Sequence, residues 1–176
     1  MRRRLALAWA AIWLAPVARA AEARLAAPNV VPITPHLVTS GQPTADSLAT
    51  LGQLGFEAVI YLAPLSVPDA VAAEPELLAR QHIEFLNVPI AFDQPSAADV
   101  EAVANVLDRW RDKKVLVHCQ VNMRASSMVF LYRVLRLKEP PERAYEAVEQ
   151  VWSPRGAWRR LIVEQLREHG IAFEPY

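Results

Sequence analysis

VLVHCQVNMRASS, residues 115–127, joins a short apolar run to a helix-like run through a polar loop. We predict that the apolar run is a strand delivering Cys119, the chain's only cysteine, to the loop, and that a helix begins near Arg124. Ligands of open α/β sheets bind beyond the carboxyl ends of the strands. The first turn of a helix adds unpaired N–H groups and a positive dipole, which favour an anion. The segment therefore predicts an anion-binding pocket beside a thiol.

The side chains and amides of this loop suit an oxyanion. Arg124 carries a permanent charge on a planar fork, which can bind an oxyanion through two hydrogen bonds. The hydroxyl of Ser126 or Ser127 could hydrogen-bond the sulfur or the bound anion. The loop has no glycine, so Asn122 is expected to take any left-handed backbone position. The residues expected to bind the substrate are Gln120, Val121, Asn122, Met123 and Arg124.

His118-Cys119, followed by Arg124 and Ser126, resembles the signature loop of the protein tyrosine and dual-specificity phosphatase superfamily. The earlier SGQP, residues 40–43, with a helix-like run and AVIYL after it, is similar to the start of a bacterial branch. That branch is related to the phosphatase-like domains found beside β-lactamase-like hydrolases. The resemblance implies a cysteine-dependent phosphatase that hydrolyses phosphate monoesters, phosphoproteins among them, through a phosphocysteine intermediate.

The resemblance covers about residues 37–137 and implies a role for each site residue. Cys119 would be the nucleophile, and Arg124 with the loop amides would hold the phosphate. Ser126 would assist departure of the thiolate. No metal or organic cofactor is required, because two steps through a phosphocysteine need only a thiolate, an acid and water.

The resemblance also requires a general acid from another loop. Asp93 lies in the turn after the strand-like run EFLNVPI, residues 84–90. Adjacent parallel strands would bring this turn to the same end of the sheet as Cys119, so Asp93 is the candidate acid. Asp is also common in turns for its backbone hydrogen bonding, so the residue alone does not decide its role. Asp69 is a weaker candidate, because nothing in the sequence brings its loop over the pocket.

One departure from the superfamily pattern leaves three interpretations open. The superfamily has five residues between Cys and Arg, whereas Cys119 and Arg124 are separated by four. In a loop of the usual length Ala125 takes the Arg position and Arg124 points about 100° away around the helix; in a loop one residue shorter Arg124 faces the pocket. The short loop also resembles that of rhodanese-like sulfurtransferases, and a non-catalytic phosphate-binding pseudophosphatase is the third interpretation.

The rest of the chain alternates strand-like and helix-like runs up to residue 137 and is helical afterwards. This order predicts a three-layer α/β domain over residues 36–176, with a mostly parallel sheet of four or five strands and a helical C-terminal tail. Three tryptophans at apolar helix positions are expected in the core: Trp110, Trp152 and Trp158. The expected strands are residues 36–40, 58–62, 84–90 and 115–118.

The N-terminal residues predict export. Arg2–Arg4, an apolar stretch and an Ala18-Arg19-Ala20 cleavage pattern make residues 1–20 a secretory signal peptide, and the Ala- and Pro-rich residues 21–35 an arm. We therefore expect a periplasmic or secreted protein without a stable membrane span after cleavage. Losing four arginines from a chain of balanced charge leaves four excess acids, which disfavours nucleic acid as a partner. The expected partner is a phosphorylated substrate whose class, like the oligomeric state, the sequence leaves open.

Overall fold

The computed structural model describes residues 24–176, so the expected signal peptide lies outside the described residues. Its centre is a five-stranded sheet in the order β1-β2-β5-β3-β4, which confirms the predicted fold class. Only β1 is antiparallel to its neighbour, and the other strands are parallel to one another. The strands are β1 (Val31–Thr34), β2 (Leu37–Ser40), β3 (Ala58–Tyr61), β4 (Glu84–Asn87) and β5 (Val115–His118).

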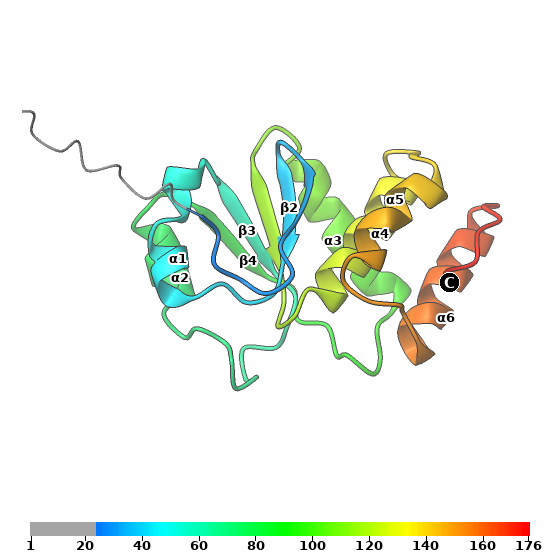
Figure 1. Ribbon diagram of the computed structural model, residues 1–176, viewed down its shortest axis with the longest axis horizontal. Coiled ribbons are helices and arrows are strands. Elements are labelled where there is room, and N and C mark those ends of the chain that lie inside the picture. The colour runs from blue at the N-terminus through cyan, green and yellow to red at the C-terminus, as the bar shows by residue number, and fades with distance from the viewer. Residues whose placement is uncertain (1–23) are drawn as a thin grey trace, which may run out of the picture.

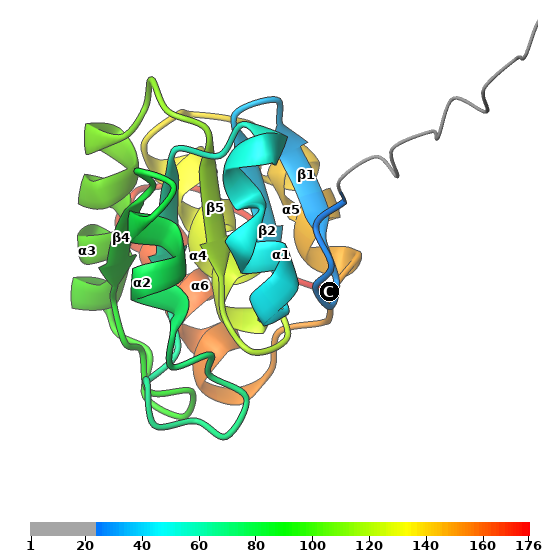
Figure 2. The same ribbon diagram turned by 90° about the vertical axis from the view of Figure 1, so that its left-hand side faces the viewer.

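Helices cover both faces of the sheet (Figures 1 and 2). On one face, α1 (Ala45–Ala49) and α2 (Glu74–Ala79) bury a small core that includes Leu48, Leu78 and Leu116. A larger core lies on the other face under four helices. They are α3 (Ala97–Arg109), α4 (Met123–Leu135), α5 (Pro141–Glu149) and α6 (Gly156–Glu168).

Capping residues set several helix ends where the sequence places them. The Thr44 hydroxyl accepts a hydrogen bond from the Ser47 amide and begins α1. Ser96 and Asp99 form a complete capping box at the start of α3. Gly55 ends a 3₁₀ turn, Leu51–Leu54, with a φ of 79°. This turn follows α1 after Thr50, so two short helical segments stand between SGQP and β3.

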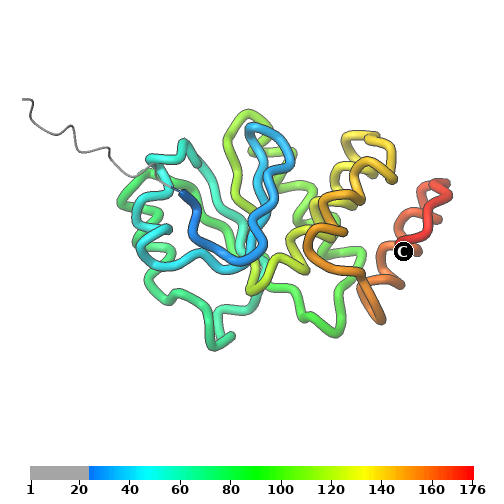
Figure 3. Tube along the Cα trace, in the orientation of Figure 1, coloured from blue at the N-terminus to red at the C-terminus, as the bar shows by residue number. Residues whose placement is uncertain are grey.

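Three features differ from the expectations. Residues 31–34, expected within the arm, form edge strand β1, and the residues before them are tied to the domain: Gly41 N–H donates to the Pro28 carbonyl at 2.7 Å. Figure 3 shows strand β1, in blue, running beside β2. Strand β4 ends at Asn87, two residues before Pro89, which has no N–H for a sheet. Strand β3 lies between β4 and β5, so the turn after β4 is not next to the Cys119 strand.

The parallel strands nevertheless bring three loops to one edge of the sheet. The loops after β3, β4 and β5 all leave the carboxyl ends, at the lower edge in Figure 1. They carry Asp69, Asp93 and Cys119 respectively. The topology thus gathers the candidate residues at the edge where α/β sheets bind ligands.

Candidate active site

The anion loop, residues 119–124, turns from β5 into α4 through a left-handed residue. Asn122 has a φ of 73° and is the N-cap of α4, so the position expected for a left-handed residue is confirmed. Its side-chain amide donates to the Asn29 carbonyl at 2.6 Å and to the Thr39 hydroxyl at 3.0 Å. Asn tolerates this conformation better than other non-glycine residues, and the two bonds hold it there.

The main chain of the loop leaves N–H groups for an anion. Asn122 makes no side-chain capping bond to the helix that it starts. Within residues 24–176, the amides of Met123 and Arg124 donate to no protein acceptor. The Gln120 carbonyl accepts from the Gln42 amide at 3.0 Å, and the next N–H in a trans peptide points the opposite way. The Val121 N–H therefore points away from Gln42, and an uncapped helix start of this kind binds anions.

Arg124 is held by residues of the loop after β4 and by Gln120 of the anion loop. Its Nε donates to the Ile90 carbonyl at 2.9 Å, and Nη1 lies 3.4 Å from Oε1 of Gln120. Its Cζ is 5.0 Å from the centre of the Phe92 ring, a cation–π contact. Together with Gln120, Phe92, Val121 and Met123, this side chain lines a hollow of about 340 Å³. The guanidinium is thus held at one edge of a space that can accommodate a small ligand.

Cys119 lies at the first position of the loop and has no exposed surface. Its N–H donates to the Ser40 carbonyl at 3.2 Å. Because the thiol is covered, side chains over it must part before a phosphorus atom can reach the sulfur. The hydroxyls of Ser126 and Ser127 both donate to the Met123 carbonyl, at 3.3 and 2.9 Å.

The two acidic candidates occupy different places at this edge. Asp93 is exposed and lines a second hollow with Pro95 and residues of α6. Its neighbour Phe92 lines the hollow of Arg124. Asp69, whose loop the sequence did not connect with the pocket, accepts a 2.7 Å hydrogen bond from Nε2 of Gln120. The structure therefore brings a second carboxylate to the anion loop, where sequence reasoning had little reason to expect one.

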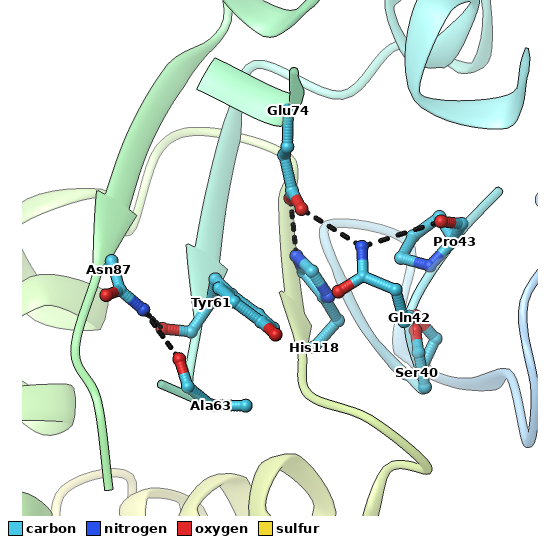
Figure 4. Close-up of polar contacts among 9 residues, drawn as sticks. Ser40, Gln42, Pro43, Tyr61, Ala63, Glu74, Asn87 and His118 are labelled. Atoms are coloured by element: carbon cyan, nitrogen blue, oxygen red, sulfur yellow. Dashed lines mark hydrogen bonds and ion pairs between the residues drawn. The ribbon is translucent and has the colours of Figure 1, made fainter. Parts of the chain in front are cut away.

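A buried polar network, absent from the sequence expectations, lies on the α2 side of the loop (Figure 4). Glu74 is 2% exposed; its Oε1 is 2.7 Å from Nε2 of His118 and its Oε2 accepts from Nε2 of Gln42 at 3.0 Å. The Tyr61 ring stacks on His118 at 4.7 Å. Burial, with smaller contributions from the charges of Asp69 and Glu74, raises the pKa of Tyr61 to about 12. Tyr61 is thus a neutral phenol at physiological pH.

In residues 24–176, no group of three or more His, Cys, Asp or Glu side chains could hold a metal ion. None of the helices described there is long and apolar enough to cross a membrane.

Comparison with known proteins places this chain among phosphatases. Residues 31–159 match the family described as "DSP-PTPase phosphatase fused to NAD+ Kinase". A DUF442 phosphatase of Shewanella putrefaciens CN-32 is 28% identical, with a TM-score of 0.74 over 81% of this chain and 92% of that one. No curated protein matches significantly.

Two more distant structures share the fold. TpbA of P. aeruginosa, in complex with pTyr, is 24% identical, with a TM-score of 0.57 over 69% of this chain and 72% of its own. PTPMT1 in complex with PI(5)P is 17% identical, with a TM-score of 0.66 over 79% of this chain and 95% of its own. With the family match over residues 31–159, the chain belongs to the DSP-PTPase phosphatase family and is a cysteine-dependent phosphatase.

Proposed function

We propose that this phosphatase hydrolyses phosphate monoesters at the anion loop, with Cys119 as the nucleophile. The observation that carries the proposal is that the loop beginning at Cys119 holds both the Arg124 guanidinium and the uncapped start of α4, next to a hollow that Arg124, Gln120 and Met123 line. Arg124 and the amides of the loop bind the three phosphoryl oxygens. This arrangement stabilises the negative charge of the transferring group.

The reaction proceeds in two displacements. The Cys119 thiolate attacks phosphorus and the ester P–O bond breaks, while Asp93 gives a proton to the leaving oxygen. Water then attacks the phosphocysteine, the S–P bond breaks, and the Asp93 carboxylate takes a proton from the water, which releases inorganic phosphate and regenerates the thiolate. Ser126 assists departure of the thiolate by turning its hydroxyl from the Met123 carbonyl to the sulfur.

We propose that the substrate is a phosphate monoester and that the protein is exported. TpbA in complex with pTyr and PTPMT1 in complex with PI(5)P support a monoester, on a protein or on a lipid headgroup. The arginine-rich start, apolar stretch and Ala-Arg-Ala pattern of residues 1–20 support a signal peptide and a periplasmic or secreted location.

Hydrolysis of p-nitrophenyl phosphate and phenyl phosphate by the purified protein tests the proposal. Cys119→Ser should abolish turnover of both esters while phosphate binding persists. Asp93→Ala should slow phenyl phosphate, the poorer leaving group, by about a hundredfold or more, and p-nitrophenyl phosphate much less. Asp69→Ala serves as the matched control.

Three results would contradict it. Full turnover by Cys119→Ser would show that Cys119 is not the nucleophile. A leaving-group effect in Asp69→Ala instead of Asp93→Ala transfers the acid role to Asp69. Sulfur transfer from thiosulfate to cyanide without ester hydrolysis replaces the phosphatase reaction altogether.

A further inference from the structure

The SGQP turn, conspicuous in the sequence but unused by the reaction, lies against the anion loop. The Ser40 carbonyl accepts from the Cys119 amide at 3.2 Å, and the Gln42 amide donates to the Gln120 carbonyl at 3.0 Å. Between them, Gly41 and Val121 form an isolated antiparallel bridge. Three consecutive residues of the turn thus pair with the first three residues of the loop.

Gly41 permits this close approach. A Cβ atom at this position would lie 2.7 Å from the Gln120 carbonyl oxygen and 2.9 Å from Cβ of Pro28. Both contacts are shorter than real side chains make, and one of them is to backbone. The turn can therefore hold the Gln120 carbonyl only with glycine here.

The side chain of Gln42 connects this turn to the residue that precedes Cys119. Figure 4 shows the connection: Gln42 donates to one oxygen of Glu74, and His118 contacts the other. Gln42 is 9% exposed, Glu74 2% and His118 not at all. One carboxylate from α2 therefore bridges two segments that both reach the anion loop.

The burial of this carboxylate is costly. Among the described residues its ionisable partner is His118, and no lysine or arginine pairs with it. Three polar atoms beside it already lack a partner among the described residues: Gln42 Oε1, His118 Nδ1 and Tyr61 Oη. Buried ion pairs replaced by well-packed apolar residues often leave stability unchanged or improved. A role in geometry therefore explains a buried carboxylate at this position better than a role in stability.

We propose that Glu74 and Gln42 are positioning residues that fix the shape of the anion loop. Glu74 holds the Gln42 side chain and the His118 ring. The backbone N–H of Gln42 in turn holds the Gln120 carbonyl away from the pocket. The carbonyl of residue 120 then stays out of the phosphate site, and the Val121 N–H points away from the turn. This inference rests on the proposed function, because it assigns the shape of the loop to phosphate binding.

Four variants test the proposal: Glu74→Ala, Glu74→Gln, Gln42→Glu and the exchange of both residues, Gln42→Glu with Glu74→Gln. Glu74→Ala should weaken binding of inorganic phosphate about tenfold and lower kcat/KM about a hundredfold. It should also speed exchange of the Cys119 and Gln42 backbone amides, whose hydrogen bonds join the loop to the turn. Gln42→Glu should be at least as damaging, because it buries two carboxylates side by side. The exchange restores an amide–carboxylate pair and should recover most of the lost phosphate affinity and kcat.

Glu139→Gln is the matched control. It breaks a partly buried ion pair with Arg133 in the segment after α4, and should leave phosphate affinity and exchange of the Cys119 and Gln42 amides unchanged. The proposal is overturned by unchanged exchange and phosphate affinity in Glu74→Ala and the isosteric Glu74→Gln, by an equal loss in Glu139→Gln, or by no recovery in the exchanged pair. Failure of the natural protein to hydrolyse any ester would overturn the proposed function instead, since amide exchange still reports on the loop.

Discussion

On one side of the anion loop the polar side chains of Gln42, Glu74 and His118 are buried, whereas on the other the carboxylates of Asp69 and Asp93 are exposed. We call the first group the floor and the second the rim. The floor holds the nucleophile strand through bonds between segments far apart in the chain. The rim adjoins exposed Phe92, which borders the hollow. The difference teaches that the residues before and beside Cys119 are fixed by buried contacts, whereas the two candidate acids are not.

Arg124, which lies in the anion loop against Phe92, should show the largest effect. Arg124→Lys keeps the charge but removes the planar fork and the Nε bond to the Ile90 carbonyl. We expect kcat/KM to fall by roughly a hundredfold or more, measured by steady-state hydrolysis of p-nitrophenyl phosphate. Arg133→Lys, in the same helix, is the control. Equal activity of Arg124→Lys and the natural protein would show that a point charge suffices and that the planar guanidinium of Arg124 has no role of its own.

Asn122 tests how far the loop depends on side-chain contacts. Asn122→Ala places alanine at a φ of 73° and removes two side-chain bonds, at a cost of about 2–3 kcal/mol in the free energy of unfolding. Asn122→Gly relieves the backbone but still lacks the bonds. Urea unfolding and phosphate titration measure both variants.

Lys138 supplies the matched control for Asn122. It takes a similar φ of 59° at the far end of α4, and its Nζ donates to the Leu135 carbonyl at 2.7 Å, a bond that Lys138→Ala removes. Lys138→Ala should destabilise the fold without changing phosphate affinity. Were Lys138→Ala and Asn122→Ala to lower phosphate affinity alike, the loss would reflect general destabilisation rather than the shape of the loop.

Features of this site with local signals could be predicted from the sequence, whereas the buried floor could not. The loop, its left-handed Asn122 and the caps Thr44 and Ser96 were predictable, because their signals are local. Glu74 was missed because a glutamate before Pro75 is typical of an exposed first helical turn. Its burial depends on packing of α2 against β5, which residue spacing does not encode.

Three other features were unpredictable for related reasons. The order β1-β2-β5-β3-β4 follows from long-range packing of strands that look alike as sequences. The prolines around β1 hide an edge strand, because an edge strand tolerates residues without an N–H donor. The contact between Asp69 and Gln120 likewise depends on a loop path, which has no periodicity to read.

Trp158 offers a test of the rim. Its indole N–H, on a residue that is almost wholly buried, donates to the Phe92 carbonyl at 2.8 Å, one residue before Asp93. Trp158→Phe removes this bond and should slow phenyl phosphate about tenfold while changing p-nitrophenyl phosphate little, since only the poorer leaving group needs the positioned acid. The control is Trp110→Phe. Trp110 is also buried and is the C-cap residue of α3. An equal slowing of both esters would point to a general loss of structure.

Tyr61, which stacks on His118 of the floor, tests whether ionisation matters there. Burial raises the pKa of Tyr61 to about 12. A raised pKa contributes stability that is complete below pH 10, where the unfolded phenol is protonated, and that is lost as pH rises towards 12. Tyr61→Phe should therefore flatten the fall in unfolding free energy between about pH 10 and 12 and leave kcat unchanged near pH 7. Urea unfolding at pH 9 and pH 11.5 measures this; parallel curves for both proteins would contradict it.

The smallest loss of stability is expected for an exposed ion pair that lies far from both the floor and the rim. Lys113 and Glu84 pair at the opposite edge of the sheet, with side chains 33% and 50% exposed. The hydrogen bond from Lys113 lowers the pKa of Glu84, so its contribution is present above the ordinary carboxyl pKa and lost as pH falls below it. Lys113→Met should cost no more than about 0.5 kcal/mol, and 1 M salt should remove the difference. A loss as large as that of Asn122→Ala would mean that exposure does not separate strong from weak polar contacts in this fold, and the contrast between floor and rim would lose its physical basis.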